Sequence, residues 1–336
     1  MDLRKSEHRL ETFKDFYRFH LEFNLHPGMV YSWLPAIAEH YNLDADGRAW
    51  LTWLNGCTQN PVTTLLLLNE APTVNRWRRA VAFWDEHFTK LAWDTDRRHQ
   101  KATFGDATKT WVQTYGQDPA NNWRRAARTG WNGIWTYAKG HPFMGRLSAW
   151  SMSEYAYILK LHDIDAGDLL LTDPASTSHR NGLRILSGAD IDIAPWDKDR
   201  SNPSEAAKLE RLAGLIMKEV SGATFWTLES ALCTYKSWHK PNRRYPGVYA
   251  DMAYERLTKA EGVWGKRFDV LWASRAVSLP VYLRLEDSPN DPGLCPEKQN
   301  HYLQTGQTVT MGRWQPKYRS EFDDQVDAGT FYARRI

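Results

Sequence analysis

Two stretches of the chain decide the predicted fold: KGHPFMGRLSAW at 139–150 and DLLLTDPASTSHRNGLRILSG at 168–188. The first is typical of a glycine-bounded turn that opens a helix over 145–161. In the second, a short apolar run leads into a loop of small, hydroxylated residues that carries Asp173. That loop then presents His179 and Arg180 before another apolar run begins at Leu183. An acid, an imidazole and a guanidinium therefore fall within eight positions.

The rest of the chain up to about residue 285 also has helical periodicity. Aromatic residues recur every three or four positions over 7–41, with a break at Pro27-Gly28. Asp44 is placed to cap the next helix, and 64–69 is expected to be the middle of another. Further helices are predicted over 74–91, 118–137, 204–220 and 227–238. We therefore predict a mainly α-helical body over 1–285 and an irregular extension over 286–336, in which 305–311 is a short hairpin arm.

The composition is that of an ordinary soluble globule, with 42% hydrophobic and 25% charged residues among 336. The first residues mix charges of both signs, and no window holds eighteen uncharged apolar residues, so we expect a cytoplasmic protein without a membrane span. Cys57, Cys233 and Cys295 are odd in number and lack zinc-ligand spacing. We expect reduced thiols and no metal site.

Arginine and tryptophan occur together at several places, as in 76–79, 93–98 and 123–125. Arginine with aromatic residues is what a surface needs to hold phosphates and stack bases. The net charge of +3 is too small to diagnose nucleic-acid binding by itself. We expect most of the seventeen tryptophans to lie in the core.

The turn at 139–145 and the helix start that follows form a candidate phosphate site. Free backbone amides at a helix start favour an anion, and Arg146 and Ser148 would add donors. Lys139 stands beside them as a candidate DNA contact. An ordinary helix–helix turn explains the same residues, because glycine and proline punctuate any loop.

The loop after Asp173 is a second candidate. Ser176, Ser178, His179 and Arg180 supply donors for phosphate oxygens, together with one group that titrates near neutrality. The alternative is structural, because Asp before Pro174 commonly forms an Asx-turn or caps a helix.

A third candidate is the predicted helix over 227–238, where Glu229, Cys233 and Lys236 share one face at i, i+4 and i+7. Glu229 can deprotonate an amine, Lys236 can hold a leaving phosphate, and Cys233 is a candidate nucleophile. The alternative is that Cys233 is a small buried hydrophobe and that Glu229 and Lys236 are a solvated pair.

Two basic segments complete the candidate DNA contacts. The loop after residue 239 contains Arg243, Arg244 and Tyr245, which suit a phosphate backbone or a stacked base. Arg97 and Arg98 follow Asp94 and Asp96, although a salt-bridged loop explains this cluster equally well. Two acids alone do not identify a metal site.

Several of these segments together resemble the phage amino acid:DNA transferases, also called α-glutamyl/putrescinyl thymine pyrophosphorylases, and most nearly their second clade. The likeness spans about residues 7–270. The motifs that carry it are FKDFYRFHL (13–21), WDTDRR (93–98), GRLSAW (145–150), SHRNGL (178–183), LESALCTYK (228–236) and RYPGVY (244–249).

The resemblance implies a helix-hairpin-helix DNA glycosylase-like helical fold that leaves the glycosidic bond intact. It also implies a host-cytoplasmic, phage-encoded enzyme that acts on double-stranded DNA carrying phosphorylated 5-hydroxymethyl-dU. A free amino acid, with glycine a leading candidate, or a polyamine would replace the phosphate or pyrophosphate. The product is hypermodified thymine that resists host nucleases. No cofactor is implied, and a need for Mg²⁺ is left open.

Our assignment gives Asp173 or Glu229 the role of base and surrounds the leaving group with His179, Arg180, Arg146 and Lys236. Such an enzyme must expose or flip the base, which costs a few kcal/mol. Two alternatives are a true helix-hairpin-helix DNA glycosylase that uses Asp173 for base excision, and a non-catalytic DNA-binding protein.

Overall fold

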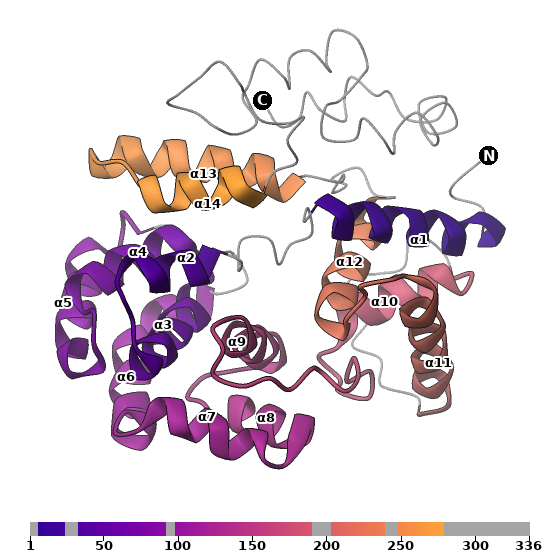
Figure 1. Ribbon diagram of the computed structural model, residues 1–336, viewed down its shortest axis with the longest axis horizontal. Coiled ribbons are helices and arrows are strands. Elements are labelled where there is room, and N and C mark those ends of the chain that lie inside the picture. Colours follow the sequence, from indigo (N-terminus) through magenta and orange to yellow (C-terminus); the bar gives the residue numbers. More distant parts are fainter. Residues whose placement is uncertain (1–5, 24–32, 92–97, 190–202, 239–247, 279–336) are drawn as a thin grey trace, which may run out of the picture. The chain divides into compact units, whose positions relative to one another are not determined.

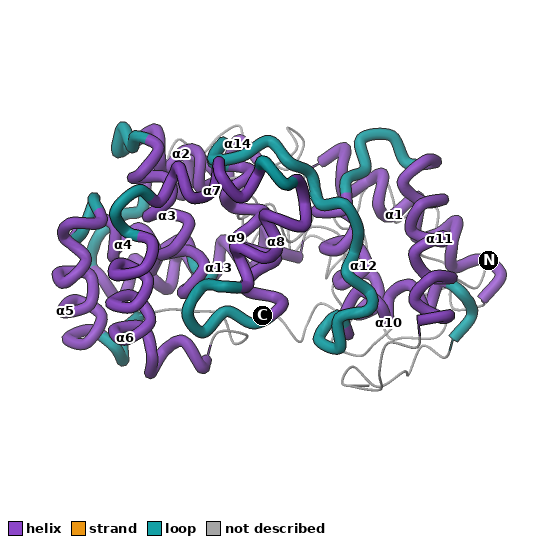
Figure 2. The backbone as a smooth tube through the Cα atoms, turned by 90° about the horizontal axis from the view of Figure 1, so that it is seen from below, coloured by secondary structure: helices purple, strands orange, loops and turns teal. Residues whose placement is uncertain are grey.

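The computed structural model describes residues 6–23, 33–91, 98–189, 203–238 and 248–278 (Figure 1). These residues form fourteen α-helices and one short 3-10 helix, and no strand occurs among them (Figure 2). The prediction of a mainly α-helical body is confirmed for this part of the chain. The predicted extension over 286–336 and the hairpin arm over 305–311 lie outside the described residues, so the boundary near 285 stays a prediction.

The described residues group into two compact units. Unit 1 contains residues 6–23, 166–189, 203–238, 248–255 and 275–278, and unit 2 contains 33–91, 98–165 and 256–274. Helix α13 (Val248–Trp264) contributes to both units, and α14 (Asp269–Ser278) belongs mainly to unit 2. No described helix is long and apolar enough to cross a membrane.

Unit 1 is built on α1 (Ser6–Phe23), α10 (Thr177–Leu186), α11 (Pro203–Glu219) and α12 (Phe225–Trp238). The aromatic residues that recur along α1 face α12. Tyr235 packs edge-on against Phe13 at 5.2 Å and Phe16 at 5.3 Å between ring centroids. Helix α12 begins at a capping pair, because the Thr224 hydroxyl accepts from the Thr227 amide and the Thr227 hydroxyl accepts from the Thr224 amide.

Helices α10 and α12 approach each other closely at Gly182. A Cβ at this position would lie 2.8 Å from the backbone oxygen of Leu232 and 3.0 Å from its Cβ. Only glycine allows this crossing without displacing the backbone of α12. The side chains on either side of Gly182 are consequently brought against α12.

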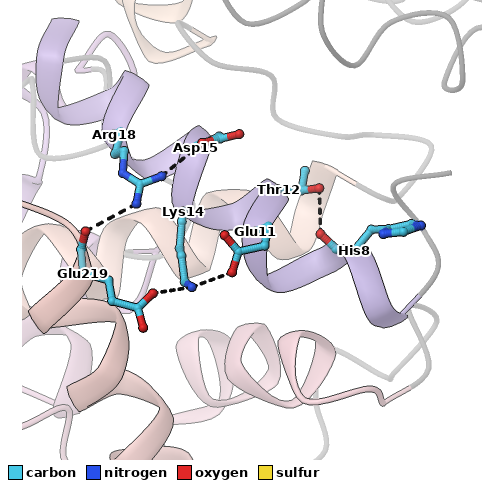
Figure 3. A network of polar contacts seen from close by, with 7 residues as sticks. All are labelled: His8, Glu11, Thr12, Lys14, Asp15, Arg18 and Glu219. Carbon is cyan, nitrogen blue, oxygen red and sulfur yellow. Dashed lines mark hydrogen bonds and ion pairs between the residues drawn. The ribbon is translucent and has the colours of Figure 1, made fainter. Parts of the chain in front are cut away.

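A polar network joins α1 to α11 (Figure 3). The Lys14 ammonium bridges Glu11, at 2.6 Å, and Glu219 at the end of α11. Arg18 pairs with Asp15 at 3.1 Å and donates to the backbone oxygen of Glu219 at 3.3 Å. Because most of these groups are partly exposed, we expect them to fix the orientation of α1 more than to add stability.

Unit 2 contains the remaining helices. In chain order they are α2 (Trp33–His40), α3 (Ala45–Thr58), α4 (Pro61–Glu70), α5 (Trp77–His87), α6 (Arg98–Tyr115), α7 (Pro119–Ala127), α8 (Gly130–Lys139) and α9 (Arg146–Ile158). The predicted cap of α3 is confirmed, because the Asp44 carboxylate accepts from the Gly47 amide at 2.8 Å. Asn60 caps α4 in the same way.

Tryptophans dominate the core of unit 2. Trp53 and Trp111 stack at 5.2 Å, and both are essentially inaccessible to solvent. The indole of Trp50 donates to the Ala71 carbonyl at 2.7 Å, and that of Trp53 donates to the Thr108 hydroxyl at 3.2 Å. The expectation of buried tryptophans is confirmed for nine described ones: Trp33, Trp50, Trp53, Trp84, Trp111, Trp123, Trp150, Trp226 and Trp272.

The single helix predicted over 118–137 is two helices, α7 and α8. Gly130 separates them with φ of +69°, a left-handed conformation that glycine adopts at little cost. The apolar period continues across this break, which is why the sequence pattern indicates one element.

Candidate active site

Helices α10 and α12 bring four of the predicted site residues together in unit 1. His179 Nδ1 lies 3.2 Å from Glu229 Oε1, and both side chains are buried. One position earlier on α10, the Ser178 hydroxyl accepts a hydrogen bond from the Cys233 thiol. The predicted helix over 227–238 is confirmed, so Glu229, Cys233 and Lys236 lie on successive turns of α12.

The His179–Glu229 contact joins two buried ionisable groups. His179 Nε2 lies 3.0 Å from the carbonyl oxygen of Leu169, and because a carbonyl only accepts, Nε2 carries a hydrogen. His179 is thus held on one side by the loop before α10 and faces Glu229 on the other.

Side chains at the start of α10 hold the carbonyl groups of the preceding loop. His179 binds the Leu169 oxygen, and the Ser176 hydroxyl donates to the Leu170 oxygen at 2.7 Å. The Arg180 guanidinium donates to the Leu171 oxygen at 3.2 Å and to the Asp173 oxygen at 3.5 Å. The loop over 168–176 is thus fixed from the α10 side.

The Glu210 side chain, on α11, binds the same loop through hydrogen bonds with the backbone of Leu169 and Leu171. Burial and the nearby Asp168 raise the pKa of Glu210, while these amide hydrogen bonds oppose the rise. Leu170 between the two amides has φ of +52°, which is unusual for leucine. The loop therefore keeps a strained conformation through contacts on both sides.

Asp173 lies half-buried at the end of this fixed loop. Its Oδ1 accepts from the Ala175 amide at 2.8 Å, so the Asx-turn considered as the structural alternative is present. Oδ2 makes no hydrogen bond within the described part of the chain. One carboxylate oxygen is therefore used by the turn, and the other is open to a ligand.

The prediction that a loop presents His179 and Arg180 is wrong. Both residues belong to the first turns of α10 and are 1% exposed. The helix begins directly after Ser176, and the side chains of this first turn point back onto the loop that precedes it. Arg180 thus donates to the backbone carbonyls of Leu171 and Asp173, and its predicted role at the leaving group stays a prediction.

The other predicted phosphate contacts belong to unit 2. Arg146 is 4% exposed, and its guanidinium lies 4.8 Å from the ring centroid of Trp150. Ser148 is also buried, whereas Lys139 is exposed, with its ammonium 5.7 Å from the Trp135 ring. Arg146 and Ser148 sit inside the start of α9, and Lys139 ends α8.

A family model described as amino acid:DNA transferase matches residues 30–244, which include the Asp173 loop, α10 and α12. The chain belongs to the amino acid:DNA transferase family. It is also similar to the serinyltransferase of Salmonella phage ViI, with 24% identity over 305 residues, which covers 80% of this chain and 74% of the relative. No solved structure matches the chain.

The remaining predicted DNA contacts of the transferase fall largely outside the described residues. These are Arg97, Arg243, Arg244 and Tyr245. Arg98 begins α6, and its side chain is likewise outside the description. Their roles stay predictions.

Glu210 is a residue of this candidate site that the sequence did not indicate. It lies in a segment, PSEAAKLERLAGL, whose charges are typical of a solvated helix face. Only the packing of α11 against α10 and the loop shows that one of these acids is turned inward. Within the described residues, no group of three or more His, Cys, Asp or Glu side chains is arranged to hold a metal ion.

Proposed function

We propose that this transferase replaces the phosphate or pyrophosphate of phosphorylated 5-hydroxymethyluracil in phage DNA with an amino acid. Membership of the family and the similarity to a phage serinyltransferase support DNA and an amino acid as substrates. The proposal rests on the surroundings of Asp173. Its loop is held by contacts with α10 and α11, and its Oδ2 makes no hydrogen bond within the described part of the chain.

The proposed reaction is a substitution at the exocyclic methylene carbon of the base. The amine nitrogen forms a bond to this carbon, and the carbon–oxygen bond to the phosphate breaks. The phosphate or pyrophosphate leaves with the electron pair of that bond, and one proton of the amine passes to a base. The glycosidic bond is unchanged, so the sugar stays attached.

Asp173 is better suited to be that base than Glu229. The Glu229 carboxyl group is buried and lies 3.2 Å from Nδ1 of the buried His179. Asp173 is half-buried and has an oxygen that the Asx-turn does not use. A general base must reach the proton it accepts, and this favours the accessible carboxylate.

Lys236 is our candidate for binding the departing phosphate, because it lies half-buried on α12 near the Ser178–Cys233 pair. Ser178 would add a hydroxyl donor. The Cys233 sulfur contacts the Ser178 hydroxyl, and Cys233 as a nucleophile stays a prediction. We propose that Arg146 and Ser148 bind the DNA phosphate through the start of α9.

We further infer that the helical body is related to helix-hairpin-helix DNA glycosylases and that the base is flipped for reaction. The order of the turn at 140–145, α9 and the Asp173 loop supports this inference. The same resemblance supports a phage-encoded enzyme of the host cytoplasm that protects DNA from host nucleases. We propose that no cofactor is required, and parallel reactions with and without EDTA test a role for Mg²⁺.

The amino acid is proposed to be small, and serine and glycine come first in a panel of donors. Serine is a candidate because the similar enzyme of phage ViI is a serinyltransferase, and glycine is a candidate because of the family resemblance. Mass spectrometry of nucleosides after reaction of phosphorylated 5-hydroxymethyluracil DNA with each donor identifies the amine. Abasic sites in place of heavier nucleosides would identify a DNA glycosylase.

The Asp173→Asn variant tests the base directly. Asparagine retains an oxygen for the Ala175 amide, so the Asx-turn and the folding of the loop should be preserved. Because the basic oxygen is lost, we expect the transfer rate to fall by about 10²- to 10⁴-fold. Glu210→Asp is a useful comparison, since it perturbs the support of the loop and keeps the Asp173 carboxylate. A wild-type rate for Asp173→Asn would remove Asp173 from the mechanism.

A further inference from the structure

A groove of about 670 Å³ lies within unit 2, between the end of α6, α7 and α8. Its lining side chains include Tyr115, Asn122, Arg125, Thr129, Asn132 and Tyr137. None of the comparisons assigns a function to this groove, and none of the predicted site residues lines it. It is largely open to solvent, unlike a pocket that encloses a small ligand.

The walls of the groove are held in place by aromatic packing. Tyr115 and Tyr137 meet edge-to-face at 5.5 Å, and Tyr115 stacks on the buried ring of His141 at 4.6 Å. The Tyr115 hydroxyl donates to the Gly140 oxygen at 2.9 Å, and the Asn122 amide donates to the Tyr115 oxygen at 3.2 Å. The groove is therefore formed before any ligand binds.

The charge of the groove is positive. Arg125 is exposed in its wall and donates to the Asn122 side chain. Arg124 is exposed on the same helix, Arg128 is exposed directly after it, and Lys139 is exposed at the end of α8. No lining residue carries a carboxylate. The nearest acid in the sequence, Asp118, precedes α7 and accepts from Asn121 at 3.0 Å.

We propose that this groove binds the phosphodiester backbone of DNA. A free amino acid needs an anionic partner for its ammonium group as well as a cation for its carboxylate, and the lining offers only the cation. A phosphodiester needs a cation and neutral donors, and Arg125 supplies the first and the Asn132 amide the second. An open groove also lets a polymer pass through.

DNA as the natural ligand rests on the proposed function, but the test does not require the transfer reaction. The binding of unmodified duplex DNA is measured by fluorescence anisotropy over a range of salt concentrations. For Arg125→Ala we expect the dissociation constant to rise about threefold to tenfold and the salt slope to fall by about one. Arg125→Lys should keep the slope, since it keeps the charge.

Arg267→Ala is the matched control, because Arg267 is an exposed arginine of unit 2 that pairs with Asp269 and does not line the groove. We expect it to leave both affinity and slope at wild-type values. Equal effects of Arg267→Ala and Arg125→Ala, or no effect of Arg125→Ala, would overturn the groove as a DNA site. A wild-type chain that does not bind DNA would also overturn it.

The transfer assay keeps this proposal separate from the proposed function. A wild-type chain that binds DNA through Arg125 but transfers no amine would refute the function and leave the groove standing. The opposite outcome is an Arg125→Ala variant with a normal transfer rate at saturating DNA and a raised KM for the amino acid alone. That result would show that the groove binds the amine donor, and the DNA proposal would fail.

Discussion

The buried contact between His179 and Glu229 is the residue-scale feature on which the site depends. Glu229→Gln preserves it, because the glutamine amide can donate to Nδ1 of an imidazole that still donates from Nε2 to Leu169. Glu229→Ala removes the partner and leaves a cavity. We expect a loss of about 1–3 kcal/mol in unfolding free energy for the alanine variant and a much smaller loss for glutamine, measured by urea denaturation.

Transfer activity of the same two variants separates structure from chemistry. If Glu229 only supports His179, the glutamine variant should retain most of its rate. A glutamine variant that folds normally and has lost its activity would instead make Glu229 the base and contradict the assignment to Asp173.

For individual residues, the sequence indicated which side chains contact each other but not how deeply they are buried or which groups they bind. The helical spacing of Glu229 and Cys233 and the cluster after Asp173 predicted residues that do come together, at His179–Glu229 and Ser178–Cys233. Their burial could not be predicted, because it depends on the close crossing at Gly182. The loop carbonyls that Arg180 binds could not be predicted either, because they depend on how the preceding loop folds.

At the scale of elements, helices with a strong apolar period were predictable and helices with weak intrinsic propensity were not. Helix α6 contains Gly105 and four threonines, which disfavour a helix. It is stabilised by burial of Phe104, Ala107 and Trp111 in the core of unit 2. Such tertiary stabilisation leaves little trace in local sequence, so α6 is absent from the predicted elements.

The break between α7 and α8 gives a prediction about glycine. Gly130 has φ of +69°, and a Cβ added there would meet no atom within 4 Å. Gly214 inside α11 also has open space around it, but its backbone is that of an ordinary helix. Gly130→Ala should therefore destabilise the protein by about 1 kcal/mol through backbone strain alone. Gly214→Ala should stabilise it by about 0.5–1 kcal/mol.

Thermal unfolding of Gly130→Ala and Gly214→Ala checks these two predictions. Since neither new methyl group meets a neighbour, opposite shifts of the melting temperature isolate the conformational effect. Shifts of the same sign would mean that the chain does not take the left-handed conformation at Gly130.

At the scale of the whole molecule, the stability of the protein should depend on two buried histidines of unit 2. Burial lowers the pKa of both His141 and His162 to about 4, whereas histidine in the unfolded chain titrates near 6.5. The unfolded state therefore binds more protons between these values. Stability is complete above about pH 6.5 and is lost as the pH falls toward 4.

Between pH 7 and pH 5 we expect each histidine to account for a loss of about 2 kcal/mol in unfolding free energy. His162→Gln should reduce the difference between the two pH values by about that amount, whatever it does to stability at pH 7. An unaltered difference in His162→Gln would contradict the lowered pKa.

The fate of labelled nitrogen tests the central claim most directly. Phosphorylated 5-hydroxymethyluracil DNA is incubated with the transferase and ¹⁵N-labelled serine or glycine, and the nucleosides are then analysed by mass spectrometry. We predict a nucleoside in which ¹⁵N is bonded to the exocyclic carbon, the sugar is intact and one phosphate or pyrophosphate is released per nitrogen gained. Release of the free base with abasic DNA, and no ¹⁵N in any nucleoside, would contradict it.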